Sequence, residues 1–555
     1  MKFIGFSHLE PFAEYFHDTN IGMVENDKIC FGALEERYSR IKHHAGFPNG
    51  ALKAMLKHCN VDMDNQVKVV LSENRDSSII DTSNFIPENR FHKDIINFFK
   101  EDSRILYCHH QLAHASVAFR LSPFRTALVI TLDGLGHDFG KQCFGAVIKG
   151  EDNHLKRLKT CWSSGNSLGL FYGMVTEALG WRISDGEGKT MGLSAYGNAD
   201  VLYNELVHYA PHVEGSDLVG GYDFNVKSDL INYRHSISEP AIAHLSKLAK
   251  QAGREQLAAA AQKLLEDIVI KWVDSLLRQY TEIKNICLGG GIFLNVSVNT
   301  KLREFFPNFH FFVPPSPADA GIGIGAALEA AAYYGAARPI VSQVHFLGSK
   351  YNLDTLDFTE RGFIAQRIDE PADKIALALE RGDVVGLYQG RSEWGPRALG
   401  NRSVLANPMV SGIRDRINRN MKKRELFMPF APAILESEFG NWFEGATSDS
   451  PYMMFTYRAL SKKAHLIRSV LHVDNTGRVQ TVSKKDNPLL FEILRAFYKR
   501  TNYPLLLNTS FNLHGLPIVE TPEEALDHLR HGCVDCLFIN HTMVRLKKKK
   551  GKMYS

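Results

Sequence analysis

Long hydrophobic runs are missing from this 555-residue sequence, and so is a strong excess of charge of either sign. The first residues contain no apolar stretch of signal-peptide length, and no later segment approaches the roughly 20 apolar residues of a membrane span. The 65 basic and 61 acidic residues leave a net charge of +4, which gives no general reason to expect nucleic acid or membrane as a partner. We therefore expect a cytoplasmic protein that binds neither.

Cysteine is also scarce, and 8 cysteines in a chain of this length do not form a disulfide framework. Cys533 and Cys536 make a single CxxC pair without a second pair, which is more typical of reduced structural thiols than of a zinc or redox site. The chain is too long for one hydrophobic core, so two or three domains are expected. A hydrophobic content of 44% and a charged content of 23% are ordinary for a globular protein.

A pattern of strand, polar loop and hairpin occurs twice in the first part of the sequence. The strand-like segments of the two copies are residues 3–6, 21–24 and 29–34, and then 127–132 and 143–148. The first loop holds His17 and Asp18, and the second, which is rich in glycine, holds His137 and Asp138. Two such copies predict a duplicated α/β core with a ligand cleft between its halves. Helices are expected at 49–59 and 95–100.

His110 and His114 form the strongest concentration of chemistry in the sequence. On a helix, two residues four positions apart lie on one face, close enough to share a metal ion. Zinc proteases use this spacing but need a glutamate directly after the first histidine, where this chain has Gln111, so a protease is excluded. Asp133, after an apolar strand, and Asp319 are candidate oxygen ligands, and such a set suits Fe²⁺, Mn²⁺ or Zn²⁺ better than Mg²⁺. The alternative is a pair of surface or core histidines without a metal.

Glycine-rich turns from strand to helix occur at two places in the same half. Gly289-Gly290-Gly291 follows an apolar strand, and Gly321 begins a second glycine-rich turn directly after Asp319. Backbone N–H groups in such turns can bind phosphate, so the two turns predict a nucleotide cleft with a bound cation. Close packing of a helix on a sheet also selects glycine. Lys189, in the segment 187–193, is a candidate phosphate ligand, although that segment by itself is more typical of a loop.

The sequence pattern changes after residue 332, and we expect a domain boundary between residues 345 and 346. The second domain contains an arginine-rich stretch, residues 389–403, in which glycines separate Arg391, Arg397 and Arg402. Guanidinium forks and backbone donors in such a stretch favour a pocket for phosphate or carboxylate over a solvated surface. Nucleic acid is the main competing ligand, but the stretch lacks the interleaved aromatic residues on which bases stack.

Several of these motifs stand together in one order along the chain. They are His110-x-x-x-His114, Asp133-Gly134, 187–193, Gly289-Gly290-Gly291 with Asn295, Asp319-Ala320-Gly321, 395–403, His472-Val473-Asp474 with 478–481, and 508–512. In this order the sequence resembles the NodU/CmcH family of O-carbamoyltransferases from about His17 onward. The resemblance implies a duplicated actin/Hsp70/sugar-kinase-like (Kae1-like) domain over residues 1–345. It also implies a YrdC-like α/β domain over residues 346–555.

The resemblance also implies a reaction: carbamoyl phosphate and ATP give a carbamoyl-adenylate, whose carbamoyl group passes to a hydroxyl of a small, secondary metabolite. It implies Fe²⁺ or another divalent transition metal on His110, His114, Asp133 and Asp319, and ATP with or without Mg²⁺. The implied nucleotide-binding residues are Lys189, Gly289, Gly290, Gly291, Asn295 and Gly321. The implied carbamoyl-phosphate ligands are Arg402, Lys423, Arg424, Arg478, Asn508 and Ser510.

Catalytic roles are expected for His17, His114 and Arg478. His17 is the candidate for a role near the proton of the acceptor hydroxyl, and a structural loop histidine is the alternative. Lys422 competes with Lys423 for the family lysine, and Lys423 is our choice. Two other functions stay open: a threonylcarbamoyl-type factor that acts on tRNA, which the balanced charge does not favour, and a non-catalytic nucleotide-binding regulator. A homodimer is one candidate assembly.

Overall fold

The computed structural model describes residues 1–7, 18–61, 67–72, 105–139, 141–221, 239–339, 344–353, 356, 358, 362–445 and 450–547. The chain forms two compact units. Unit 1 comprises residues 1–347 with the short segments 394–396 and 454–456, and unit 2 comprises residues 348–393, 397–453 and 457–555. The chain therefore leaves unit 1 close to the expected boundary, but two short segments of the second half pack into unit 1. His17 and the expected helix at 95–100 lie outside the described residues.

Unit 1 contains two five-stranded sheets with the same strand order, β3-β2-β1-β4-β5 and β8-β7-β6-β11-β12. The first consists of β1 (Lys2–Phe6), β2 (Asn20–Glu25), β3 (Lys28–Leu34), β4 (Val67–Leu71) and β5 (Ile105–Tyr107). The second consists of β6 (Thr126–Asp138), β7 (Lys141–Glu151), β8 (His154–Trp162), β11 (Asn285–Gly289) and β12 (His310–Phe312). In each sheet the first strand pairs antiparallel with the next strand and parallel with a later one. This repeated order confirms the duplicated, actin/Hsp70/sugar-kinase-like core.

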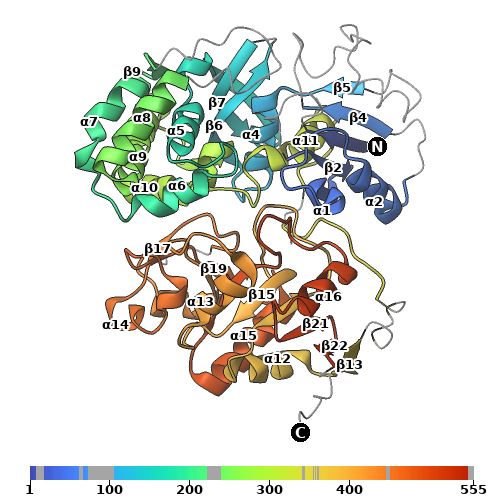
Figure 1. Cartoon of the computed structure of the whole chain (residues 1–555). Helices are drawn as coiled ribbons and strands as arrows, with labels where there is room; N and C mark the ends of the chain where they lie inside the picture. Colours follow the sequence, from blue (N-terminus) through green and yellow to red (C-terminus); the bar gives the residue numbers. More distant parts are fainter. Residues whose placement is uncertain are drawn as a thin grey trace. The chain divides into compact units, whose positions relative to one another are not determined.

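Helices α4 (His110–Arg120) and α11 (Ile322–Tyr333) lie between the two sheets (Figure 1). Helix α11 contacts α4, β1 and β2, and α4 contacts β6 and β11. Small residues make this close packing possible, because a Cβ atom at Gly5 of β1 would lie 1.9 Å from the carbonyl oxygen of Gly323 in α11. The outer face of the first sheet is covered by α2 (Asn49–Cys59), which begins and ends where the sequence predicts. Both central helices are therefore fixed against the sheets that hold the site.

The remaining helices of unit 1 include α5 (Leu168–Ala178), α6 (Glu187–Ser194), α8 (Glu239–Ala252), α9 (Arg254–Gln279) and α10 (Val296–Phe305), which gather beside the second sheet (Figure 1). The expectation of a loop at 187–193 is wrong, because this segment is α6. A carboxylate oxygen of Glu187 accepts a hydrogen bond of 2.7 Å from the backbone N–H of Ser184, which stabilises the turn that leads into the helix. None of the helices in the described residues is long and apolar enough to span a membrane.

The expected glycine-rich loop at His137 and Asp138 is also wrong. After an irregularity between Leu132 and Gly136, β6 resumes its pairing with β7, so that His137 pairs with Gln142 and Asp138 with Lys141. The two residues therefore belong to a strand rather than to a phosphate-sized loop.

Unit 2 is built on one mixed eight-stranded sheet of order β13-β22-β21-β14-β15-β20-β16-β19. These strands are β13 (Phe363–Arg367), β14 (Val385–Tyr388), β15 (Arg402–Ala406), β16 (Ala431–Leu435), β19 (Gln480–Val482), β20 (Leu505–Ser510), β21 (Cys536–Ile539) and β22 (Thr542–Leu546). Helices α12 (Pro371–Glu380) and α15 (Pro488–Thr501) pack together on its apolar core, and α16 (Pro522–Arg530) contacts β14 and β21. The α/β class is confirmed, while the YrdC-like character of this unit stays a prediction.

Candidate active site

Four side chains from three elements of unit 1 meet at one point. The Nε2 atoms of His110 and His114 are 3.1 Å apart, and each lies 3.0 Å from Oδ2 of Asp133. Oδ1 of Asp319 lies 3.6 Å from Nε2 of His110 and 3.2 Å from Nε2 of His114. The two histidines and Asp133 are buried, and Asp319 is half-buried. The structure thus brings together the four residues that the sequence predicts as metal ligands.

These separations fit a divalent transition metal. Ligands that each lie about 2.1 Å from one ion are roughly 3 to 3.5 Å apart, which is the range found here. Burial and the neighbouring carboxylate of Asp319 would raise the pKa of Asp133, but its hydrogen bonds to His110 and His114 outweigh them and hold it at about 2. Two nitrogen and two carboxylate donors, one of them strongly anionic, form a suitable ligand set for Fe²⁺, Mn²⁺ or Zn²⁺.

The local structure explains how the sequence builds this cluster. Helix α4 begins at His110, so the spacing of four residues places both histidines on the same helical face. Asp133 lies in the irregular segment of β6, between the paired residues Leu132 and Gly136, where the side chain is released from the alternation of the strand. Asp319 begins a short 3₁₀ turn that leads into α11.

Neighbouring backbone groups hold the ligands in place. Nδ1 of His114 lies 3.0 Å from the carbonyl oxygen of Pro317, an arrangement that leaves Nε2 for the metal. Oδ1 of Asp133 accepts a hydrogen bond of 3.0 Å from the backbone N–H of Gly291. Gly290 has a φ of +95°, and a Cβ atom at this position would lie 2.1 Å from the carbonyl oxygen of Leu132. The glycine run thus supports the metal ligands directly, and one of its N–H groups is already used by Asp133.

The other predicted nucleotide-binding residues are not brought into one cluster. The side chain of Asn295 caps α10 by accepting from the backbone N–H of Val298 and pairs with Gln262. Lys189 lies 6.0 Å from the ring of Trp181. Gly321 packs against the carbonyl oxygen of Ser316, which a Cβ atom would approach to 2.3 Å. Their role in binding a nucleotide stays a prediction.

Unit 2 contains three half-buried guanidinium groups, those of Arg397, Arg424 and Arg478. Within the described residues, no carboxylate pairs with any of them, and Nε of Arg397 and of Arg478 has no hydrogen-bond partner. Burial lowers the pKa of Arg478 well below its usual range, and the neighbouring Arg397 and Arg424 lower it further. Since arginine does not give up its proton in a protein, such a group of like charges is stabilised by a bound anion. Sequence reasoning noted Arg397 in its stretch but did not select it as a ligand.

Arg402, by contrast, is fully buried and already bonded. Its guanidinium donates to the carbonyl oxygens of Gln389 at 2.6 Å and Asn401 at 3.1 Å, and it lies 3.8 Å from the ring centre of Tyr388. This environment favours a structural role over direct contact with a ligand.

The backbone donors that the sequence suggests for an anion in the stretch 389–403 are also occupied. Oε1 of Glu393 accepts hydrogen bonds from the backbone N–H groups of Leu399, Asn401 and Arg402, at 2.8, 2.8 and 3.1 Å. The N–H of Gly400 donates to the hydroxyl of Ser403. A carboxylate of the chain itself therefore fills the place where an external anion was expected. Nothing in the spacing of the sequence distinguishes Glu393 from a surface glutamate.

The two lysines after α13 (Ile413–Ile417) differ in environment. Lys422 is buried, and its Nζ donates to the hydroxyl of Ser510 at 2.8 Å and to Oδ1 of Asn512 at 2.6 Å. Lys423 is exposed and has a φ of +40°. Asn508 is buried, donates to Gln480, and leaves its Oδ1 without a partner. The structure thus places Lys422 rather than Lys423 beside the predicted ligand Ser510.

A second group of potential ligand atoms in unit 1 comprises Asp18, Glu36 and His43. His43 lies between two carboxylates, with Nδ1 2.9 Å from Asp18 and Nε2 3.1 Å from Asp185. Burial would lower the pKa of His43, but the two carboxylates raise it to about 10. His43 is therefore a cation at neutral pH that joins two acidic side chains.

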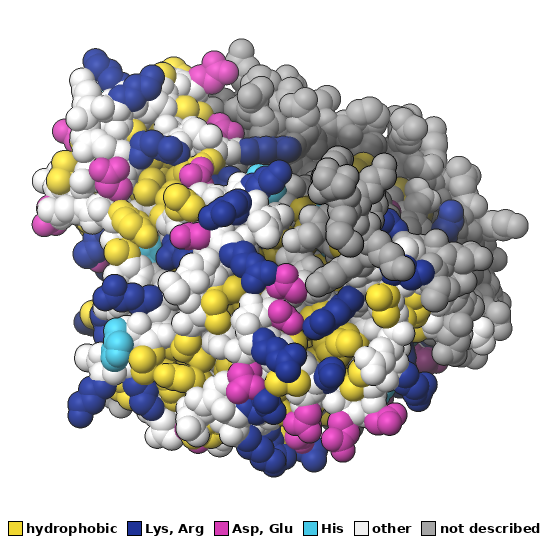
Figure 2. All heavy atoms as spheres, turned by 60° about the horizontal axis from the view of Figure 1, so that its bottom comes forward, with side chains coloured by type: hydrophobic (Ala, Val, Ile, Leu, Met, Phe, Trp, Pro, Cys, Tyr) yellow, Lys and Arg dark blue, Asp and Glu magenta, His cyan; other side chains and the backbone are white. Residues whose placement is uncertain are grey.

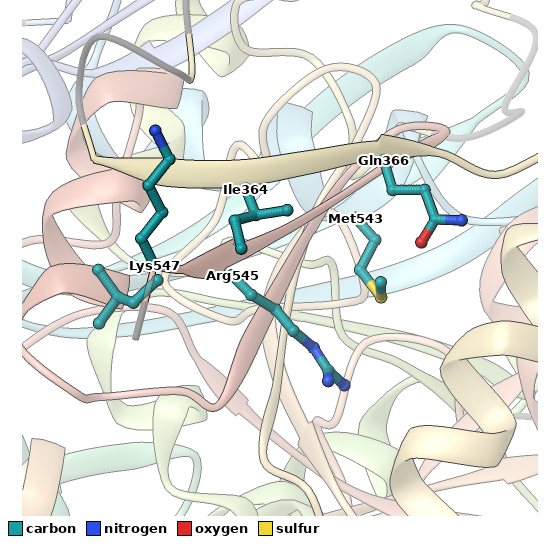
Figure 3. A pocket seen from close by; sticks show the side chains of 6 residues that line it. Ile364, Gln366, Met543, Arg545 and Lys547 are labelled. Carbon is teal, nitrogen blue, oxygen red and sulfur yellow. The ribbon is translucent and has the colours of Figure 1, made fainter. Parts of the chain in front are cut away.

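A shallow pocket of about 530 Å³ lies elsewhere, on strands β13 and β22 of unit 2 (Figure 3). Its lining residues are Ile364, Gln366, Met543, Arg545, Leu546 and Lys547. None of the predicted site residues is among them, and the pocket holds no cluster of titratable groups suited to catalysis.

Comparison with known proteins decides the family. A model of the carbamoyltransferase N-terminus matches residues 71–328, and a model of the carbamoyltransferase C-terminus matches residues 376–546. The chain belongs to the carbamoyltransferase family. Nodulation protein NolNO of Sinorhizobium fredii is 31% identical, over 98% of this chain and 81% of its own. The 3'-hydroxymethylcephem-O-carbamoyltransferase of Amycolatopsis lactamdurans is 26% identical, over 75% of this chain and 76% of its own.

Solved structures are more distant from this carbamoyltransferase. Full-length HypF in its phosphate- and nucleotide-bound form is 13% identical, over 61% of this chain and 56% of its own, with a TM-score of 0.38. A score at this level carries no argument. On the face in Figure 2, Lys and Arg side chains are interspersed with Asp, Glu and apolar side chains. The enzyme is a transferase, and its charge is distributed as the balanced composition predicts.

Proposed function

We propose that this carbamoyltransferase is an ATP-dependent O-carbamoyltransferase with a division of labour between its units. Unit 2 forms a carbamoyl-adenylate from carbamoyl phosphate and ATP, and unit 1 transfers the carbamoyl group to a hydroxyl of a small metabolite. The observation that carries the proposal is the convergence of His110, His114, Asp133 and Asp319. The printed name of the cephem relative supports a hydroxyl as the acceptor.

Adenylate formation makes demands that the residues of unit 2 are suited to meet. Carbamoyl phosphate is a small dianion, and the attack on the α-phosphorus of ATP spreads negative charge over the nucleotide. Arg397, Arg424 and Arg478 supply fixed cations that no described carboxylate neutralises. In a balanced reaction, water releases phosphate from carbamoyl phosphate, and the resulting carbamate displaces pyrophosphate from ATP.

In unit 1, the four ligands would hold Fe²⁺ or another divalent transition metal. Such an ion would supply Lewis-acid polarisation of a carbonyl group. The chain itself orients the ligands: Pro317 fixes the ring of His114, and the N–H of Gly291 fixes the carboxylate of Asp133. The acceptor hydroxyl must also lose a proton. His43 is unsuited to accept it because its pKa is raised to about 10, so that it is already protonated. His17 remains our candidate.

The test is to incubate the purified protein with Fe²⁺, ATP and carbamoyl phosphate and to measure AMP and pyrophosphate. We expect pyrophosphate release, and a carbamoylated product when a suitable hydroxyl compound is added and detected by mass. His114→Ala should spare pyrophosphate release and abolish product, while exchange of the exposed His310 for Ala should change neither. Absence of AMP and pyrophosphate with every divalent metal would refute the proposed reaction. Loss of pyrophosphate release in the His114 variant would refute the division of labour.

A further inference from the structure

Asn20 is the first residue of β2, and its side chain is fully buried. Its Nδ2 atom lies 2.7 Å from the backbone carbonyl oxygen of Asp319, 2.8 Å from that of Asp18 and 2.6 Å from the hydroxyl of Ser7. Its Oδ1 atom accepts a hydrogen bond of 3.0 Å from the backbone N–H of Gly323. One amide group thus joins the first sheet to a predicted metal ligand almost 300 positions later in the chain.

The chemistry of these neighbours determines which way the amide faces. The N–H of Gly323 is a donor and requires the oxygen of the amide, while the carbonyl oxygens of Asp18 and Asp319 require its nitrogen. The fit at Gly323 is tight, because a Cβ atom there would lie 2.6 Å from Oδ1 of Asn20. Residues without an amide cannot satisfy both sides of this arrangement.

Asn20 has a special place among the supports of the metal centre. The ligands themselves come from α4, β6 and the turn before α11, and none comes from the first sheet. The carbonyl oxygen of Pro317, two residues before Asp319, lies within hydrogen-bonding distance of Nδ1 of His114 and of the backbone N–H of Gly290. The carbonyl oxygen of Asp319 itself is bound from the other side, by Asn20. The loop that presents the Asp319 carboxylate is therefore held between the two halves of the duplicated core.

We infer that Asn20 is a positioning residue that sets the metal affinity of the centre by fixing the backbone of Asp319. The inference rests on the metal site of the proposed function. Without the amide, the turn at Asp319 can shift away from His110 and His114, and the carboxylate must then be reordered when the metal binds. Loss of such a supporting hydrogen bond typically weakens metal binding about 10- to 100-fold.

The experiment is a titration of the metal-free, full-length protein with Mn²⁺ alone, followed by electron paramagnetic resonance and calorimetry. Asn20→Asp keeps the shape of the side chain but turns an oxygen toward the carbonyls of Asp18 and Asp319. Asn20→Ser keeps one donor in less volume. The matched control is Asn299→Ala, since Asn299 is equally buried and donates to the carbonyl oxygens of Phe293 at 2.8 Å and Met454 at 2.9 Å. Thermal unfolding of each metal-free variant measures any general loss of stability.

We expect the dissociation constant for Mn²⁺ to rise about 10- to 100-fold in Asn20→Asp, less in Asn20→Ser, and hardly at all in Asn299→Ala at comparable loss of stability. Equal Mn²⁺ affinity in the wild type and both Asn20 variants would overturn the inference and leave the proposed function standing. An equal loss of affinity in the Asn299 variant would also overturn it, since the effect would then be one of general stability. Failure of the wild type to bind Mn²⁺ and Fe²⁺ would overturn the metal site and the inference together.

Discussion

Arg402, Arg397 and Arg478 carry the same guanidinium group, but their surroundings give them different roles. Arg402 is enclosed by carbonyl oxygens and lies against Tyr388, so its donors are largely used within the chain. Arg397 and Arg478 lie near each other without a carboxylate partner among the described residues. A guanidinium without an internal acceptor is available to a ligand, whereas one bonded to carbonyl oxygens stabilises the fold.

Arg478→Ala should abolish most of the adenylate-forming activity. Removing one fixed cation from a site where negative charge develops typically costs about 100- to 1,000-fold in rate. Arg478→Lys should recover part of this loss, because it restores the charge but not the planar fork. The measurement is pyrophosphate release, and Arg495→Ala is the control because Arg495 pairs only with Glu492 on the surface. Full activity in Arg478→Ala would show that the anion binds elsewhere.

Lys422→Ala should raise the concentration of carbamoyl phosphate needed for half-maximal rate, and Lys423→Ala should not. The buried ammonium of Lys422 contacts Ser510 and Asn512, while Lys423 is exposed. Loss of one charge-assisted hydrogen bond corresponds to about 1.5–3 kcal/mol, or about 10- to 100-fold. Steady-state kinetics with carbamoyl phosphate as the varied substrate compare the two neighbours directly. A larger effect at Lys423 would restore the choice made from the sequence.

At the scale of elements, function depends on places where regular structure is interrupted. Asp133 lies where β6 loses its register with β7, and Asp319 lies in a 3₁₀ turn before α11. The turn before β15 has no ladder of its own and is held by Glu393, which binds three backbone N–H groups. Such irregular segments present side chains that a regular strand or helix would direct elsewhere.

Glu393→Ala should destabilise unit 2 by about 3 kcal/mol or more, because it leaves buried N–H groups without acceptors that each cost about 1–3 kcal/mol. Glu393→Gln should cost about 1–2 kcal/mol, since the amide oxygen can still accept but carries no charge. Urea unfolding followed by tryptophan fluorescence measures both, with Glu492→Ala as an exposed control. If Glu393→Ala were as stable as the wild type, the turn at Leu399–Arg402 would not depend on this carboxylate.

At the scale of the whole molecule, residues far apart in sequence connect the two halves of the duplicated core in unit 1. Asn20 joins β2 to the turn before α11, and His43 joins Asp18 near the first sheet to Asp185 before α6. Both contacts link segments separated by more than a hundred residues. The geometry of the metal centre therefore depends on the folding of the complete unit rather than on any single motif.

The contact of His43 with Asp18 and Asp185 predicts a pH dependence of stability. The pKa of His43 is raised from 6.5 to about 10, so its contribution is fully present below pH 6.5 and is lost as the pH rises through about 10. The free energy of unfolding should thus fall between neutral pH and pH 10 more steeply in the wild type than in Asp185→Asn. Urea unfolding at several pH values measures the slopes. Asp267→Asn, which breaks an exposed pair with Lys263, should keep the wild-type slope, and equal slopes in the wild type and Asp185→Asn would contradict the assignment.

The sequence by itself determined the duplicated core and the four metal ligands. Strand alternation, the spacing of His110 and His114 and the position of Asp133 after a buried strand are local signals, and their physical basis does not require knowledge of distant contacts. The ordered motifs likewise pointed to the carbamoyltransferase family.

Only the tertiary structure decided which of several similar residues faces a ligand. Lys422 and Lys423 are neighbours with the same charge, and the three arginines of 389–403 share one glycine-rich context, so their roles differ only through the partners that folding brings to them. Glu393 and Asn20 carry no local signal either, because the groups they bind become neighbours only when the chain has folded. Hydrogen bonds between distant segments follow from three-dimensional packing, and sequence spacing does not encode them.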